Sequence, residues 1–185
     1  MQIHFSPCSP VQPSQDQDTA IFLLQSVNRP GIGSLINYLL ETDYFVAPAS
    51  TRFHNSFPGG LCLHSLNLVH TFMAANKLLL KPLPPDSVVL CGLLHDLCKV
   101  NAYLPAGNGY KSVKGIKGHA TLSLSRTGEH ILLTPEEDDI IRFHMGLFWI
   151  FTYREHDTLS MHRAIMRTPQ VQIFAALDMA DSKRK

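Results

Sequence analysis

Two long apolar runs, separated by a short proline-rich segment, constrain the fold of this chain more than any other feature. The first run is LCLHSLNLVHTFMAANKLLL (61–80), and the second is SVVLCGLLHDLCKV (87–100). Between them lies KPLPPD (81–86), whose three prolines cannot continue a helix. Asp86 or Ser87 is placed to cap the second run at its N-terminus. The pattern therefore predicts two consecutive apolar helices that both enter a core.

The other segments also favour helices, and strand signals are scarce. Pro30 can open a helix that continues through IGSLINYLLET (32–42). Helices are further expected at about 119–132, after Thr134, and between Pro169 and Lys185. YLPAGNGYKSV, within residues 101–113, favours a small hairpin. The predicted fold class is all-α, a helical bundle with one small hairpin near residues 101–113.

The clearest helix start in the sequence is TPEE, residues 134–137. Thr134 and Glu137 have the spacing of a capping box, and Pro135 stands at the first helical position. On the helix that follows, Ile140 and His144 share one face by their spacing of four residues. His144 is therefore expected to point inward, opposite an acidic outer face that includes Glu136, Glu137 and Asp139.

Length and composition set the domain organisation. A chain of 185 residues with 45% hydrophobic and 17% charged residues predicts one soluble domain with a sizeable core. Residues 1–20 are expected to form an irregular lead-in, because residues 6–18 are rich in proline, serine and glutamine. Residues 21–185 would form the single helical domain.

Charge and cysteine usage narrow the partners and the compartment. A net charge of +1 gives no strong nucleic-acid signal and no electrostatic case for a membrane surface. No apolar stretch reaches the roughly 18–20 residues that span a bilayer, and no signal-peptide pattern is present at the start. The four cysteines form no CxxC pair, which favours free thiols in a reducing compartment. A cytoplasmic location is expected.

The ten histidines are the main chemical clue. Four of them lie in or at the start of predicted helices with apolar neighbours: His64, His95, His119 and His144. Asp96 directly follows His95, and Asp178 interrupts the apolar run IFAALDM. A single buried histidine or aspartate is more often a satisfied core residue than a ligand. Six such positions in one small domain instead favour a shared metal site between facing helices.

These residues fall in an ordered series of motifs across roughly residues 50–181. The series is PGGLCLHSLNLV, LLHDLCK, GHATLS, IRFHMG and ALDMAD. It resembles the HD superfamily of metal-dependent phosphohydrolases in both the content and the order of its motifs. An adjacent His-Asp pair occurs by chance, whereas the full order H…HD…H…H…D, with Gly-Gly before the first histidine, is specific. The resemblance implies that the helical bundle of residues 21–185 is an HD domain.

The resemblance also implies a metal centre. The set for one ion would be His64, His95, Asp96 and Asp178, and a second ion would add His119 and His144. Asp96 would then bridge the two ions. The run LDMAD also offers Asp181 as the last ligand, and we prefer Asp178 because it lies deeper in the apolar run. Mixed nitrogen and oxygen ligands suit one or two divalent ions of manganese, iron, cobalt, nickel or zinc, without choosing among them.

The activity that the resemblance implies is hydrolysis of a phosphate mono- or diester, of a nucleotide or a related small phosphorylated compound. Asp96 and Lys99 would be the catalytic residues, with Lys99 near the substrate phosphate. Arg52 and His54 precede Gly-Gly where family members place groups near the cleft, although a solvated loop is an equal interpretation. Lys114 and Lys117 could line a rim over a phosphate, but a solvated basic segment is the favoured interpretation for them.

Two other functions use the same residues. HD-fold oxygenases, such as myo-inositol oxygenase, hold a mixed-valent di-iron centre with four histidines and two aspartates, and the ligand pattern here permits that chemistry. A metal-binding regulatory module without turnover is the third hypothesis, against which the complete ligand set and Lys99 count. Small HD proteins often dimerise, so a homodimer remains an open alternative.

Overall fold

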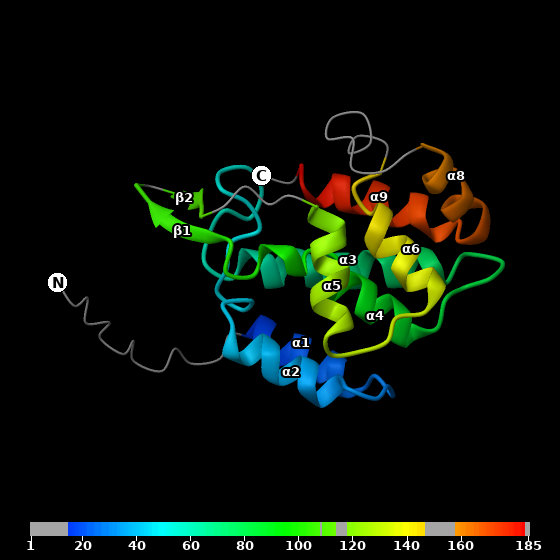
Figure 1. Ribbon diagram of the computed structural model, residues 1–185, viewed down its shortest axis with the longest axis horizontal. Coiled ribbons are helices and arrows are strands. Elements are labelled where there is room, and N and C mark those ends of the chain that lie inside the picture. The colour runs from blue at the N-terminus through cyan, green and yellow to red at the C-terminus, as the bar shows by residue number, and fades with distance from the viewer. Residues whose placement is uncertain (1–14, 108, 114–117, 147–157, 184–185) are drawn as a thin grey trace.

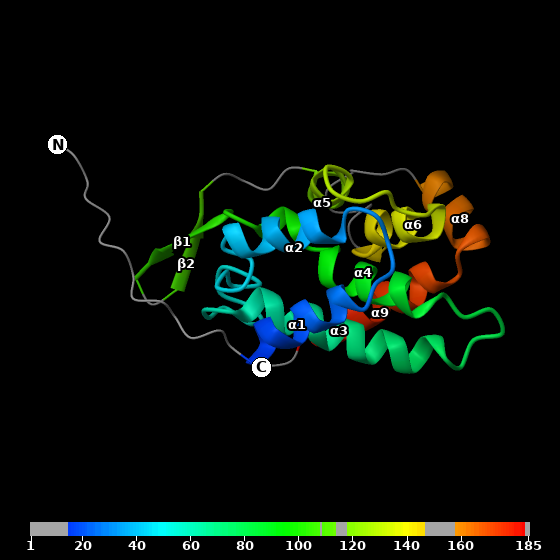
Figure 2. The ribbon, with the colours of Figure 1, turned by 90° about the horizontal axis from the view of Figure 1, so that it is seen from below.

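The computed structural model describes residues 15–107, 109–113, 118–146 and 158–183. The elements in chain order are α1 (Gln15–Gln25), α2 (Ile32–Glu41), α3 (Gly60–Asn76), α4 (Pro85–Leu94), the short 3₁₀ helix η1 (Leu97–Lys99), β1 (Tyr103–Ala106), β2 (Gly109–Ser112), α5 (His119–Gly128), α6 (Pro135–Phe143), α8 (Thr158–Arg167) and α9 (Gln170–Asp181) (Figure 1). The all-α prediction is confirmed. The expected hairpin is also present, as an antiparallel pair that projects from one end of the bundle in both ribbon views (Figures 1 and 2).

Several elements differ from the sequence prediction. Neither Asp86 nor Ser87 caps α4, because Pro84 is its N-cap and Pro85 its first residue. Helices α3 and α5 end at Asn76 and Gly128, before the expected ends at about residues 80 and 132. Helix α1 begins at Gln15, so residues 15–20 of the expected irregular lead-in are helical; Asp16 and Asp18 lie in its first turn, where acidic side chains are favourable. Helix α8 was not predicted; it buries only two side chains, those of Met161 and Ala164. The second apolar run is not one helix, since α4 ends at Leu94 and η1 starts at Leu97.

Helix α4 forms the centre of the molecule. Every residue from Ser87 to Leu94 is buried, and α3 packs along this helix as well as against α9. One face of α4, including Leu90 and Leu93, joins an apolar cluster with α1, α2 and α3. Another face, including Val88 and Cys91, joins a second cluster with α6, α8 and α9. Burial of each large apolar side chain contributes about 1.5–3 kcal/mol. The two clusters therefore hold α4 in place from both faces, and with it the start of the segment that carries His95 and Asp96.

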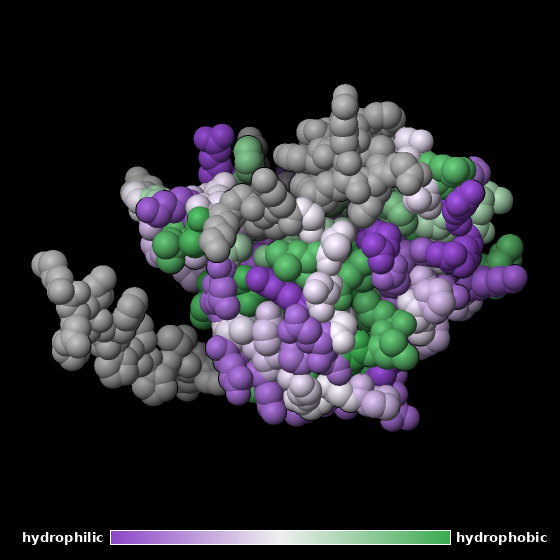
Figure 3. Space-filling view, viewed as in Figure 1, coloured by the Kyte–Doolittle hydropathy of each residue, from purple (hydrophilic) through white to green (hydrophobic). Residues whose placement is uncertain are grey.

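The surface carries both hydrophobic and hydrophilic residues. Hydrophobic residues form a broken band across the middle of the face shown in Figure 3, while hydrophilic residues dominate its lower edge over α1 and α2. Among the helices in the described part of the chain, none is both long and apolar enough to cross a membrane.

Gly92 allows α3 and α4 to approach each other closely. A Cβ atom at this position would lie 2.9 Å from the backbone nitrogen of Val69 and 3.0 Å from its Cα atom. Backbone atoms of a packed helix cannot move aside as the end of a flexible side chain can. We therefore expect Gly92→Ala to force the helices apart and to lower the free energy of unfolding by about 1–3 kcal/mol, measured by urea denaturation.

The matched control for Gly92→Ala is Gly33→Ala. Gly33 lies in α2, and a Cβ atom there would meet nothing within 4 Å. Alanine should leave stability unchanged or raise it by up to about 1 kcal/mol, because alanine favours helix more than glycine does. Wild-type stability of Gly92→Ala would contradict the close packing of α3 on α4.

Candidate metal centre

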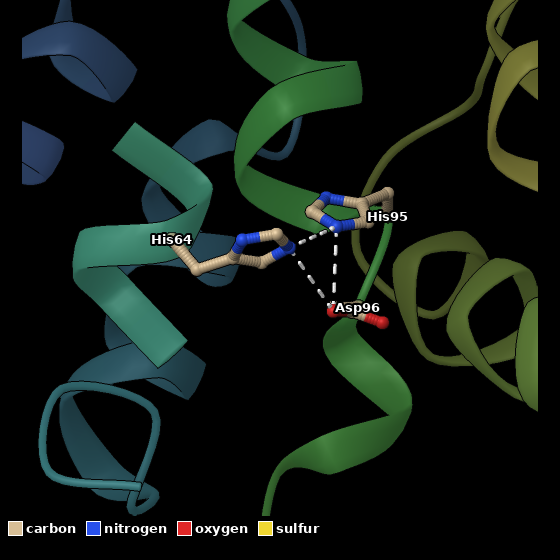
Figure 4. A group of neighbouring side chains, drawn as sticks. All are labelled: His64, His95 and Asp96. Atoms are coloured by element: carbon tan, nitrogen blue, oxygen red, sulfur yellow. Dashed lines mark hydrogen bonds and ion pairs between the residues drawn. The ribbon is translucent and has the colours of Figure 1, made fainter. Parts of the chain in front are cut away.

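The six residues that the sequence singles out as ligands lie near helix ends that converge on one point. His64 lies near the start of α3 and Asp178 near the end of α9. His95 and Asp96 lie between α4 and η1, His119 is the first residue of α5, and His144 directly follows α6. All six are buried. Figure 4 shows the imidazoles of His64 and His95 pointing toward each other and toward the Asp96 carboxylate.

The carboxylate of Asp96 lies in the middle of this cluster, and its two oxygens face different histidines. Oδ2 lies 3.3 Å from Nε2 of His95 and 3.6 Å from Nε2 of His64. Oδ1 lies 2.7 Å from Nε2 of His119 and 3.8 Å from Nε2 of His144. Thus one oxygen faces each pair of histidines, which is the arrangement that a bridging carboxylate requires.

Asp178 joins the first of these pairs. Its Oδ1 atom lies 3.2 Å from Nε2 of His64. Asp181, the alternative last ligand, lies on the other side of the same imidazole, with Oδ2 2.7 Å from Nδ1 of His64. The amide of Asn67 donates to the second Asp181 oxygen at 3.2 Å. Asp178 therefore faces the cluster, whereas Asp181 is placed to orient His64 from behind.

His95 and His144 are also oriented through their Nδ1 atoms. In His95, Nδ1 lies 2.9 Å from the carbonyl oxygen of Gly92. In His144, Nδ1 lies 2.6 Å from the carbonyl oxygen of Ile141. Because a carbonyl only accepts, both rings must donate from Nδ1, and their Nε2 atoms carry a lone pair when the rings are neutral. This outer hydrogen bond is the usual way in which proteins orient metal-ligating histidines.

The Nε2 atoms, by contrast, point toward one another and toward the aspartates. Nε2 of His144 is fully buried and has no hydrogen-bond partner among the residues that the structure describes. Nε2 of His64 lies 3.2 Å from Nε2 of His95. Burial would lower the pKa of His64, but Asp178 and Asp181 raise it to about 9; in the neutral ring, with Nδ1 donating to Asp181, Nε2 carries the lone pair. A buried polar atom without a partner costs about 1–3 kcal/mol. A divalent cation between these lone pairs would remove that cost, so the donor set fits the metal centre that the sequence predicts.

The charges at the site favour an ionised carboxylate beside an ionised amine. Burial alone would raise the pKa of Asp96, but Lys99, His95 and His119 hold it well below the ordinary value. Burial alone would lower the pKa of Lys99, but the nearby Asp96 raises it above the ordinary value. The Lys99 ammonium lies 2.5 Å from Oδ2 of Asp96. Burial, together with the neighbouring His95 and His119, lowers the pKa of His144 to about 3, so its ring is neutral.

A cavity of about 800 Å³ opens onto the cluster. Its polar lining includes Asp96, Lys99, His119, His144 and Asp178. Lys99 thus faces the same space as the candidate ligands, as expected for a residue that contacts a substrate phosphate. Cavities of this volume are typical of sites for small molecules.

The residues expected to bind substrate have different positions. His54 lines the cavity, with its ring centroid 5.1 Å from that of His64, and burial lowers its pKa to about 4. Arg52 is exposed and does not line the cavity, but its guanidinium carbon lies 5.3 Å from the ring centroid of Phe53. Lys114 and Lys117 lie outside the described residues.

No role was predicted for Cys98 from the sequence. Its Sγ atom lies 3.1 Å from Nδ1 of His119, and its backbone amide donates to the hydroxyl of Ser123 at 3.0 Å. Cys98 therefore occupies, behind His119, the position that Asp181 occupies behind His64. Its place two residues after Asp96 was a signal available in the sequence, but nothing there distinguished it from the other buried thiols.

The chain is distantly similar to one characterised enzyme. It is 25% identical over 140 residues to the 3′-5′ exoribonuclease YhaM of Bacillus subtilis (strain 168). The aligned region covers 72% of this chain but 44% of the relative, so the chain spans less than half of the length of that enzyme. No family model matches the chain, and no solved structure matches it. The similarity and the buried His/Asp cluster both support a metal-dependent phosphohydrolase.

Proposed function

We propose that this chain is a metal-dependent phosphohydrolase that cleaves a phosphate mono- or diester of a nucleotide or a related compound. The observation that carries the proposal is the convergence of four imidazole Nε2 atoms on the two oxygens of Asp96, beside a cavity that also holds Lys99. One of these atoms, Nε2 of His144, is buried without a hydrogen-bond partner among the described residues. The distant relative is named an exoribonuclease, which supports phosphodiesters of RNA as members of the substrate class.

The ligand assignment follows the two faces of Asp96. His64, His95, Asp178 and Oδ2 of Asp96 would hold one divalent ion. His119, His144 and Oδ1 of Asp96 would hold a second. When bound, such ions lower the pKa of water and polarise a phosphoryl oxygen. Asp181 and the carbonyl oxygens of Gly92 and Ile141 keep the imidazoles turned toward the ions.

The chain's own residues would bind and orient the ester. Lys99, held by Asp96, offers its ammonium protons to the phosphoryl oxygens, where negative charge increases as the bond to the leaving group breaks. His54, neutral at physiological pH because of its lowered pKa, can donate one hydrogen bond to the same phosphate. Both side chains line the cavity, so they and the metal ligands act on one substrate.

A substrate panel tests this proposal. Metal-free protein is assayed with added Mn²⁺, Fe²⁺, Co²⁺, Ni²⁺ or Zn²⁺ against nucleoside monophosphates, dinucleotides and short RNAs, and the products are identified by chromatography. The proposal expects release of phosphate or of a nucleotide only when metal is present. Consumption of O₂ with a mixed-valent iron signal would instead support the oxygenase. Metal binding without turnover of any ester would support the regulatory module.

Asp181 provides a test of how the first metal position is oriented. Asp181→Ala removes the acceptor from Nδ1 of His64, and loss of such an outer partner typically weakens metal affinity about 10–100-fold. We expect a weakening in that range, measured by calorimetric titration of the metal-free protein with Mn²⁺. Asp18→Ala, at an exposed position in α1, is the control and should bind metal as the wild type does. Unchanged affinity in Asp181→Ala would count against His64 as a ligand.

A further inference from the structure

The cavity beside the metal centre has two chemically different walls. The polar wall carries Lys99 and His54 with four of the candidate ligands, Asp96, His119, His144 and Asp178. The apolar side chains of the lining are Ala49, Phe53, Met145, Ala175 and Met179. Six further polar residues also line the cavity: Ser50, Thr51, Tyr103, Ser112, Ser182 and Lys183. A phosphate held by Lys99 leaves most of the 800 Å³ for the rest of the ester. That remaining part can therefore contact the apolar side chains of the lining, whose exposed aromatic ring is that of Phe53, while the second aromatic residue of the lining, Tyr103, is only partly exposed.

Phe53 differs from the other exposed aromatic residues in where its ring lies. Its side chain is 76% exposed and lines the cavity that contains Lys99. Phe22, which is 70% exposed, lies in α1 and does not line that cavity. Single exposed apolar residues are common and need no explanation by themselves. An exposed aromatic ring in the lining of the cavity that also contains Lys99 is a different case.

Hydrogen bonds fix the loop that carries Phe53. The hydroxyl of Ser50 accepts from the backbone amide of Phe53 at 2.9 Å and donates to the carbonyl oxygen of His54 at 2.8 Å. The backbone amide of Tyr110, in β2, donates to the carbonyl oxygen of Thr51 at 3.3 Å. The hairpin thus supports the loop from outside. Phe53 is held at the opening while His54, the next residue, reaches toward His64.

Arg52 adds a positive charge next to the ring. Its guanidinium carbon lies 5.3 Å from the centroid of Phe53, within the range of a cation–π contact. The contact places a cation beside the exposed ring, although Arg52 itself does not line the cavity that contains Lys99. An anionic ester with a planar aromatic part matches this order of groups: phosphate at the inner end, aromatic face at the opening.

We propose that the nucleobase of the substrate stacks on Phe53, so that this residue sets a preference for nucleotides over phosphate esters without a base. The proposal rests on the phosphohydrolase function proposed above. Stacking on an aromatic side chain tolerates all four bases, because every base has a π face. Selectivity is therefore expected for the presence of a base rather than for its identity.

The test compares two esters that differ only in the base. The ratio of kcat/KM for a nucleoside 5′-monophosphate to kcat/KM for ribose 5-phosphate is measured with Mn²⁺ for each protein; if only diesters are cleaved, a dinucleotide and its abasic analogue replace them. Phe53→Ala is expected to lower this ratio about tenfold, since loss of one stacking contact has an effect of that size. Phe53→Trp should keep the wild-type ratio, because indole also stacks.

Phe22→Ala is the matched control, and it should keep the wild-type ratio. If Phe53→Ala is poorly folded, Phe53→Leu takes its place, since leucine keeps apolar area but has no π face. A ratio within about twofold of the wild-type value in the folded variant would overturn the proposal. So would an equal ratio for Phe53→Ala and Phe53→Trp.

Nucleotide binding separates this proposal from the hydrolase proposal. The dissociation constant of a fluorescent ethenoadenosine monophosphate is measured with the metal-loaded protein, with no need for turnover. Phe53→Ala is expected to raise that constant about tenfold relative to Phe22→Ala. Binding that is equal in the two variants would overturn the role of Phe53. Absence of ester hydrolysis by the wild type, with this difference in binding intact, would overturn only the hydrolase function.

Discussion

Asp96→Asn should abolish metal-dependent hydrolysis while the helices persist. The substitution removes the charge from the carboxylate whose oxygens face both pairs of histidines and also leaves Lys99 without its anionic partner. Outer partners of metal ligands alone change affinity or activity by about 10–100-fold. Loss of the central carboxylate should therefore lower kcat/KM by more than about 100-fold, measured with Mn²⁺ on the best ester of the panel.

The control for Asp96→Asn is Asp138→Asn. Asp138 lies on the surface of α6, where its carboxylate pairs with Arg142 at 2.8 Å, away from the cavity. This variant should hydrolyse the ester at the wild-type rate. Both variants should keep the helical circular dichroism signal of the wild type. Substantial metal-dependent activity in a folded Asp96→Asn protein would refute the ligand assignment.

The largest expected effect on stability is at Glu137. Its carboxylate is completely buried and receives two hydrogen bonds from Arg29, at 2.6 and 2.8 Å. It also accepts from the backbone amide of Thr134 at 2.8 Å, in the capping box that starts α6. Glu137→Ala leaves the Arg29 guanidinium without its buried partner. We expect the free energy of unfolding to fall by about 3–5 kcal/mol, measured by urea denaturation.

A surface ion pair on the same helix gives the matched control. Arg142→Ala removes the pair with Asp138, in which both side chains are about one-third exposed. Such pairs contribute about 0–1 kcal/mol, so this variant should be close to the wild type in stability. If Glu137→Ala and Arg142→Ala lowered the free energy of unfolding by similar amounts, the Arg29–Glu137 pair could not be the contact that stabilises α6 against the segment between α1 and α2.

The Arg29–Glu137 pair also predicts how the stability of the fold depends on pH. Burial would raise the pKa of Glu137, but the hydrogen bonds from Arg29 and the other donors outweigh burial and lower it. A carboxyl group with a lowered pKa in the folded state stabilises the fold above its unfolded pKa, and this contribution disappears as the pH falls through the folded pKa. Glu137→Gln should therefore lose less stability than the wild type does on acidification. If the free energy of unfolding fell equally in Glu137→Gln and in the wild type as the pH is lowered, the lowered pKa of Glu137 would be contradicted.

The helices could be predicted where local chemistry determines them. The capping box of Thr134 and Glu137 gave the start of α6 correctly, because both partners lie within four residues of each other. The acidic outer face expected on this helix was wrong for two residues. Glu137 and Asp139 are buried, since Arg29 and Arg167 pair with them. Those arginines lie 108 and 28 residues away, and helical spacing does not report such partners.

The residues of the site could be named from the sequence, but their geometry could not. The apolar spacing of residues 87–100 predicted one continuous helix through the His-Asp pair. The structure instead ends α4 before His95, and Asp96 adopts a non-helical backbone before η1. The contacts of the Asp96 carboxylate with Lys99 and His119 are seen only in three dimensions. Asp178 and Asp181 were likewise close alternatives, because they lie three residues apart on one helix and face opposite nitrogens of His64.

The most direct test of the central claim is a titration of activity with metal. Protein stripped by a chelator is mixed with increasing equivalents of Mn²⁺ or Zn²⁺, and ester hydrolysis is measured at each step. The His/Asp cluster predicts no hydrolysis without metal and a rise that ends at one or two equivalents per chain. Hydrolysis that persists in the stripped protein, or that never responds to a divalent metal ion, would contradict a metal-dependent phosphohydrolase.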